Sequence, residues 1–119
     1  MKQDILGLRN VPKETIEKIL STAAEMKEKL MRGEKKLPYL AGKSVVTLFY
    51  ENSTRTRMSF ELASKYMSAS AANISASASS VQKGETLIDT GCTLDQMGTD
   101  VIIIRHPMGG APYLLARTV

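Results

Sequence analysis

The sequence predicts an α/β fold in which an open parallel sheet is flanked by helices in three layers (αβα). Two observations support this class. Segments with a helical apolar period alternate with short, continuously apolar segments along the chain, and this alternation is typical of strand–helix–strand units with right-handed crossovers. The apolar segments also lack alternating polar residues, so helices should cover both faces of the sheet that they form.

The first half of the chain predicts a helix, a strand and a second helix. The first helix should begin at Pro12, which suits a first helical turn, and end at Gly33. Residues 44–50 (Ser-Val-Val-Thr-Leu-Phe-Tyr) are β-branched, aromatic and almost wholly apolar, which is typical of a strand buried on both faces. After a polar loop, Ser53 or Thr54 should cap the next helix, whose two apolar stripes predict that it is well buried.

The second half continues the alternation. A short second strand is expected over residues 72–74, followed by a Ser/Ala-rich mobile loop over residues 75–80. A third helix should run from Glu85 to Met97. Residues 101–104 (Val-Ile-Ile-Ile) predict a third buried strand, and Pro112 marks the start of another helix.

The predicted third helix contains two unusual positions. We expect Leu87, Leu94 and Met97 to face inward. Gly91 weakens the helix by roughly 1 kcal/mol relative to alanine. Cys92 follows it and is expected to be an inert core thiol rather than a nucleophile.

Size and composition limit the possible functions. The chain has 119 residues, which suits one domain over residues 1–119 with its own core. A lone cysteine offers neither an internal disulfide nor a metal cluster and suits a reducing cytoplasm. The sequence has no apolar run that could span a membrane, and a net charge of +4 with 5% aromatic residues does not suit a nucleic-acid binder. Because the chain stops at Val119, inside the last predicted helix, we expect it to be a fragment of a longer polypeptide.

A dense group of donors follows the first predicted strand. Residues 53–57 (Ser-Thr-Arg-Thr-Arg) open a helix beyond the carboxyl end of a strand, where open α/β sheets bind ligands. Backbone N–H groups at a helix N-terminus favour anions, and guanidinium groups suit phosphate. The sequence therefore predicts a phosphate site, although the hydroxyls could instead only cap the helix while the arginines pair with nearby acids.

Two further segments bear on this site. Arg105 follows the third predicted strand and should emerge at the same sheet edge as Arg55, and two converging arginines are costly unless an anion lies between them. His106 is the only histidine, but no carboxylate or nucleophile accompanies it, so we interpret it as structural. Lys83 lies in the flexible segment 75–84, which would be either a lid over the site or a solvated loop.

Three motifs resemble one family. Residues 53–57 resemble the phosphate loop shared by aspartate and ornithine carbamoyltransferases. Residues 82–87 (Gln-Lys-Gly-Glu-Thr-Leu) resemble the mobile-loop motif of the aspartate enzymes, and residues 105–107 (Arg-His-Pro) resemble their third element. Their order and spacing agree with the family from the first helix to Ala116. The chain is thus similar to the N-terminal, carbamoyl-phosphate-binding domain of an aspartate carbamoyltransferase.

The resemblance implies roles for the loop. Ser53, Thr54, Arg55 and Thr56 would bind the phosphate of carbamoyl phosphate, and Thr56 and Arg105 would reach its carbonyl oxygen. Arg55, Thr56 and Arg105 would act in catalysis. The implied reaction transfers the carbamoyl group to the amino group of L-aspartate in de novo pyrimidine biosynthesis, releases phosphate, and uses no metal or other cofactor.

The resemblance also implies partners and absences. Ser79 and the catalytic Lys83 would enter the active site of a neighbouring subunit, which implies a homotrimer, whereas Arg57 would be structural. The family's aspartate-binding domain and its His-Pro-x-Gln segment are absent, and His106 does not replace that histidine. We therefore expect this chain alone not to complete the reaction.

Two other functions remain open. The chain could be a phosphate- or carbamoyl-phosphate-binding module that catalyses no reaction. It could also belong to a carbamoyltransferase for ornithine or another amine. Lys83 favours aspartate over ornithine, because an ammonium group suits an acidic co-substrate.

Overall fold

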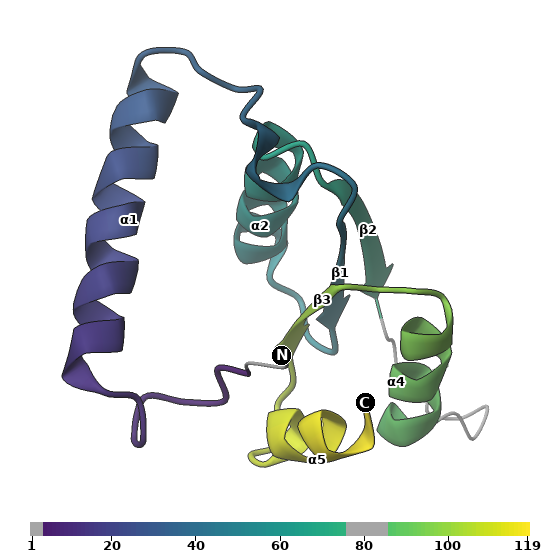
Figure 1. Ribbon diagram of the computed structural model, residues 1–119. Coiled ribbons are helices and arrows are strands. Elements are labelled where there is room, and N and C mark those ends of the chain that lie inside the picture. The colour runs from purple at the N-terminus through teal and green to yellow at the C-terminus, as the bar shows by residue number, and fades with distance from the viewer. Residues whose placement is uncertain (1–3, 76–85) are drawn as a thin grey trace. The chain divides into compact units, whose positions relative to one another are not determined.

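The computed structural model describes residues 4–75 and 86–119, and the chain divides into two compact units, Met1–Lys35 and Lys36–Val119. The first unit contains the helix α1 (Lys13–Met31), which follows Pro12 as predicted (Figure 1). It ends where Gly33 adopts a positive φ of 82°, a conformation that glycine adopts readily after a helix. No residue of α1 is buried.

The second unit is built on a three-stranded parallel sheet (Figure 1). Its strands are β1 (Ser44–Phe49), β2 (Ser70–Ser75) and β3 (Val101–Arg105). Their order is β2-β1-β3, and β1 pairs in parallel with both neighbours. The predicted open parallel sheet is confirmed, and the weakly signalled second strand is longer than residues 72–74.

Helices alternate with these strands in the predicted order. They are α2 (Thr54–Tyr66), α4 (Leu87–Gln96) and α5 (Ala111–Thr118), and a short 3-10 helix, η1 (Pro38–Leu40), precedes β1. The helix α4 begins two residues later than predicted, because Thr86 is its N-cap and forms a capping box with Asp89. Residues 76–80, which carry most of the predicted mobile loop, lie outside the described residues.

The central strand β1 is packed against other residues on both faces of the sheet. Val46 and Leu48 form a buried cluster with Leu94 of α4 and Leu115 of α5. Because side chains alternate along a strand, Val45, Thr47 and Phe49 face the other side, and they are buried as well. The helix α2 contacts β1 and β2, so the sheet lies between helices on both faces, as the sequence predicts.

Two predictions of complete burial are wrong. Val101 is 42% exposed and the rest of β3 is at best half-buried, because β3 is an edge strand of the described sheet. The helix α2 buries only Ser64, while Met58, Phe60 and Leu62 are exposed. These exposed residues come from both apolar stripes of the helix, so neither stripe is fully covered in the described residues.

The interior of α4 also differs from expectation at two positions. Leu94 is buried and Leu87 is half-buried, as predicted, but Met97 is 74% exposed because it is the C-cap residue beyond the helix. Cys92 is exposed rather than part of the core. The helical turn that directs Gly91 and Leu94 inward directs Cys92 and Thr93, which lie between them, away from the core.

Close packing explains the glycine in α4. Gly91 is buried, and a Cβ atom added there would overlap the Cδ1 atom of Leu115 and lie 3.4 Å from a methyl carbon of Val119. Leu115 is itself a buried core residue of α5, so its side chain has little room to move. The missing side chain thus allows α4 and α5 to approach each other.

We expect Gly91→Ala to lower the free energy of unfolding by up to about 2 kcal/mol, because overpacking typically costs ~1–3 kcal/mol and helix propensity returns ~1 kcal/mol. Urea denaturation measures the change. Gly109→Ala is the matched control, since a Cβ atom there meets nothing within 4 Å. A Gly91→Ala variant that is more stable than the unaltered chain by the full ~1 kcal/mol of helix propensity would contradict the packing role of Gly91.

A polar anchor joins the starts of β1 and β3. The backbone N–H of Ser44 donates to Oδ2 of Asp100 at 2.9 Å, and the Ser44 hydroxyl donates to the Gly98 carbonyl at 3.0 Å. The N–H of Asp100 donates in turn to the Ser44 carbonyl at 3.0 Å. The backbone hydrogen bond from Ser44 lowers the pKa of Asp100 below its ordinary value of 3.8, more than the opposing desolvation raises it.

We expect Asp100→Asn to destabilise the protein at neutral pH but not in acid. A lowered folded-state pKa stabilises the fold above the ordinary pKa of 3.8, and this contribution disappears as the pH falls through the folded pKa. Urea denaturation between pH 7 and pH 3 should therefore show the two stabilities converging at the acid end. Asp95→Asn, on the exposed surface of α4, is the control. A difference that is constant with pH would contradict the role of the carboxylate charge.

Candidate functional site

The loop after β1 places the N-terminus of α2 at the carboxyl edge of the sheet (Figure 1). Ser53 is the N-cap residue, but its side chain makes no capping hydrogen bond within α2. Its Oγ atom instead accepts a hydrogen bond from Nη1 of Arg105 at 2.9 Å. The first backbone N–H groups of a helix have no intrahelical acceptor, so this end of α2 favours an anion.

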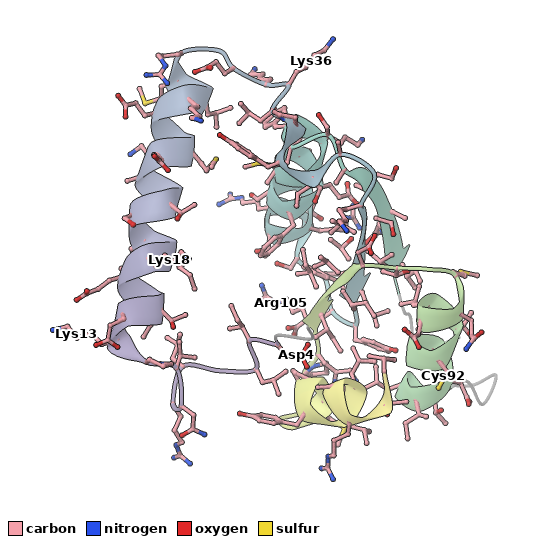
Figure 2. All side chains as sticks on the ribbon, viewed as in Figure 1. Asp4, Lys13, Lys18, Lys36, Cys92 and Arg105 are labelled. Carbon is pink, nitrogen blue, oxygen red and sulfur yellow. The ribbon has the colours of Figure 1, made fainter. Side chains whose placement is uncertain are left out.

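Arg105 connects the end of β3 to this loop. The parallel register pairs Arg105 with Phe49 at the end of β1. From there its Nη1 atom donates to Ser53 Oγ at 2.9 Å and to Thr56 Oγ1 at 3.4 Å. Figure 2 labels Arg105 on its strand. The predicted convergence of Arg105 with the loop is therefore observed.

Glu51 is a member of this cluster that the sequence analysis missed. Its Oε1 atom lies 2.8 Å from Nε of Arg105, and both side chains are partly exposed, at 40% and 46%. Arg105 thus has an acid partner, an arrangement that the sequence analysis considered only for the arginines of residues 53–57. An exposed ion pair contributes only ~0–1 kcal/mol, so a phosphorylated ligand could compete for the same guanidinium group.

The two arginines of the loop differ in their surroundings. Arg55 is exposed, and within the described residues its guanidinium group forms no hydrogen bond or ion pair. Nε of Arg57 lies 3.9 Å from Oε1 of Glu61, one turn further along α2. The geometry favours a ligand-binding role for Arg55 and a structural role for Arg57.

His106 contacts its neighbours rather than the loop. Its ring lies against the ring of Tyr50, with centroids 4.5 Å apart and planes tilted by 51°. Its Nδ1 atom accepts a hydrogen bond from the backbone N–H of Met108 at 3.0 Å. These contacts support the structural interpretation.

The structure describes only part of the predicted site. Arg105 donates hydrogen bonds to both Ser53 and Thr56, and Thr54 and Arg55 form the first turn of α2 beside them. Ser79 and Lys83 lie outside the described residues. Glu51 could have been found from the sequence only by noting that an acid follows β1 at the edge where Arg105 emerges.

Two other kinds of site are absent from residues 4–75 and 86–119. This part of the chain contains no group of three histidine, cysteine, aspartate or glutamate residues placed to hold a metal ion. It also contains no helix that is long and apolar enough to cross a membrane.

The fold and the loop define a class of protein: a parallel αβα domain with a helix N-terminus and cationic side chains beyond the carboxyl ends of its strands. Residues 3–119 match the family model described as aspartate/ornithine carbamoyltransferase, carbamoyl-P binding domain. The chain belongs to this family, as its three motifs predict.

Curated relatives are much longer than this chain. It is 68% identical over 117 residues to an aspartate carbamoyltransferase catalytic subunit from Ruminiclostridium cellulolyticum and 67% identical over 117 residues to one from Acetivibrio thermocellus. Each match covers 98% of this chain but only 37% and 38% of the respective relative. The chain therefore spans well under half the length of the relatives that it matches.

Solved structures show the same relation. The chain resembles aspartate transcarbamoylase from Trypanosoma cruzi in complex with phosphate, with a TM-score of 0.87 and 34% identity. It resembles the complex of that enzyme with carbamoyl phosphate and aspartate with a TM-score of 0.86 and 34% identity. Both matches cover 98% of this chain and 36% of the solved one.

Because Glu51 pairs with Arg105, we expect the Glu51→Gln variant to bind inorganic phosphate about threefold to tenfold more tightly than the unaltered chain. The substitution keeps an acceptor for Arg105 but removes a negative charge, and repulsion between like charges near a surface is on the order of 1 kcal/mol. Calorimetry at low salt measures the dissociation constant, and 1 M salt should reduce the gain.

The matched control is Asp95→Asn, which removes the same charge before the start of β3, at the opposite end of that strand from Arg105. It should leave phosphate binding nearly unchanged. Equal or weaker phosphate binding by Glu51→Gln would show that the carboxylate does not compete with the anion.

Proposed function

We propose that the chain, as one domain over residues 1–119, binds carbamoyl phosphate at the N-terminus of α2. The observation that carries this proposal is the pair of hydrogen bonds from Arg105 to Ser53 and Thr56. They place the guanidinium group of Arg105 beside the first turn of α2. The positive charge of Arg105, the hydroxyl groups of Ser53 and Thr56 and the backbone N–H groups of the helix therefore lie close together. This combination suits a phosphate dianion.

Each donor has a proposed place on the ligand. Ser53, Thr54 and Arg55 bind the phosphate, and their backbone N–H groups and hydroxyls supply directional donors. Thr56 also binds the phosphate and, with Arg105, reaches the carbonyl oxygen. The guanidinium group of Arg55 is exposed and makes no hydrogen bond or ion pair with the described residues, so it is suited to a bidentate contact with phosphate oxygens.

The proposed reaction is carbamoyl transfer to the amino group of L-aspartate. The amine attacks the carbonyl carbon and the bond to the bridging oxygen breaks. Phosphate leaves with the electron pair and takes up the proton that the amine nitrogen loses. Negative charge grows first on the carbonyl oxygen, near Thr56 and Arg105, and then on the phosphate, near Arg55. One fixed donor aimed at such an oxygen contributes roughly 3 kcal/mol in well-studied sites.

The identity of the acceptor amine rests on the relatives. The curated relatives at 68% and 67% identity are both aspartate carbamoyltransferase catalytic subunits, which favours aspartate over ornithine. This chain supplies the carbamoyl-phosphate side of the site. The remaining part would lie in the length of the relatives that this chain does not span.

The proposed assembly is a cytoplasmic homotrimer that acts in de novo pyrimidine biosynthesis. In it, Ser79 and Lys83 reach the site of a neighbouring subunit, where the lysine ammonium group attracts an acidic co-substrate. The resemblance of residues 82–87 to the mobile-loop motif supports this arrangement.

We expect Arg55→Ala to weaken binding of carbamoyl phosphate by about tenfold to a hundredfold, because a charge-assisted hydrogen bond contributes ~1.5–3 kcal/mol. Titration calorimetry of the chain measures this loss. Arg117→Ala, in the last turn of α5, removes the same charge away from the loop and should bind like the unaltered chain. Equal losses in both variants, or no saturable binding by the unaltered chain, would overturn the proposal.

A further inference from the structure

Arg105 needs support that its strand does not supply. β3 pairs with β1 along only one of its edges in the described sheet, so backbone hydrogen bonds hold its end from one side. The last of them joins the Tyr50 N–H to the Arg105 carbonyl at 2.8 Å. Beyond this point β1 turns into the loop and no longer runs beside the chain that follows β3.

Beyond the end of the sheet, side-chain contacts still join the segment after β1 to the segment after β3. The ring of Tyr50, from the β1 side, lies 4.5 Å from the ring of His106, from the β3 side. His106 is also fixed to its own turn, because its Nδ1 atom accepts from the Met108 N–H at 3.0 Å. Both residues adjoin the site in sequence, since Tyr50 precedes Glu51 and His106 follows Arg105.

We propose that Tyr50 and His106 form a positioning pair that sets Arg105 against the loop. The pair fixes the separation between the segment that carries Ser53 and Thr56 and the segment that carries Arg105. His106 therefore contributes to anion binding through Arg105, without contacting the anion. This inference rests on the proposed function, but the placement of Arg105 is a separate observable.

The geometry explains why both contacts of His106 are needed. The ring contact alone would leave the turn after Arg105 free to pivot, and the Met108 hydrogen bond alone would leave it free to move away from β1. Together they hold the imidazole at two points on different segments. An alanine at position 106 loses both, while the Glu51–Arg105 ion pair remains possible.

A double-mutant cycle tests the route through Arg105, with inorganic phosphate as the probe. We expect His106→Ala to weaken phosphate binding by about tenfold, which corresponds to a displaced charged donor. If His106 acts through Arg105, the double variant His106→Ala/Arg105→Ala binds no more weakly than Arg105→Ala alone. Losses that multiply would overturn the proposal, as would unchanged binding by His106→Ala.

A spectroscopic measurement keeps the inference separate from the proposed function. In the unaltered chain without phosphate, the Arg105 Nε–H donates to Glu51 at 2.8 Å, so its NMR signal should be sharp and protected from exchange. We expect it to broaden and exchange faster in both His106→Ala and Tyr50→Leu.

Gly91→Ala is the control for a general loss of stability, because it acts on the α4–α5 contact and should leave the Arg105 signal in place. A sharp, protected signal in His106→Ala overturns the positioning role. If the unaltered chain binds no phosphate, the proposed function is wrong. The positioning role is still tested in that case, because the Arg105 Nε–H signal can be compared between the unaltered chain and His106→Ala without phosphate.

Discussion

The burial of β1 on both faces and its pairing on both edges is the constraint on which the second unit depends. Every residue from Val45 to Phe49 is buried, and both β2 and β3 take their register from this strand. Thr47, the one polar residue among them, donates a hydrogen bond to the side chain of Asn73 at 2.9 Å, so its hydroxyl does not penalise burial. A shift of one residue would exchange its two faces and disrupt both packed layers.

The same register builds the candidate site. Because Phe49 pairs with Arg105, the residues that follow β1 and the residue that ends β3 reach the same edge. The loop then turns directly into α2, whose N-terminus lies against Arg105 through Ser53. Neither half attracts an anion as strongly alone, because the helix end offers only partial charge and Arg105 is already paired with Glu51. The site is thus a consequence of strand pairing more than of any single residue.

The sequence predicts those features whose physical cause lies in neighbouring residues, and misses those that depend on residues distant along the chain. The continuous apolar run of β1 and the start of α2 at residues 53–54 can be predicted from the local sequence, and both elements formed as expected, although the side chain of Ser53 makes no capping hydrogen bond within α2. The exposure of Val101 and the role of Gly91 depend on partners distant in sequence: a free sheet edge in one case and Leu115 in the other. Glu51 escaped notice for the same reason, because its partner Arg105 lies 54 residues away.

The pairing of Arg105 with Glu51 suits a site that must accept and release a charged ligand. Backbone N–H groups at the helix end are fixed by the fold, whereas a guanidinium group on a long side chain loses conformational entropy when a ligand orders it. Glu51, Ser53 and Thr56 already hold that group in place, so part of the ordering cost belongs to folding and not to binding. The carboxylate also limits affinity, because the anion must share or displace it. A donor that is ordered before binding yet exchangeable suits turnover better than one that is either free or permanently bound to phosphate.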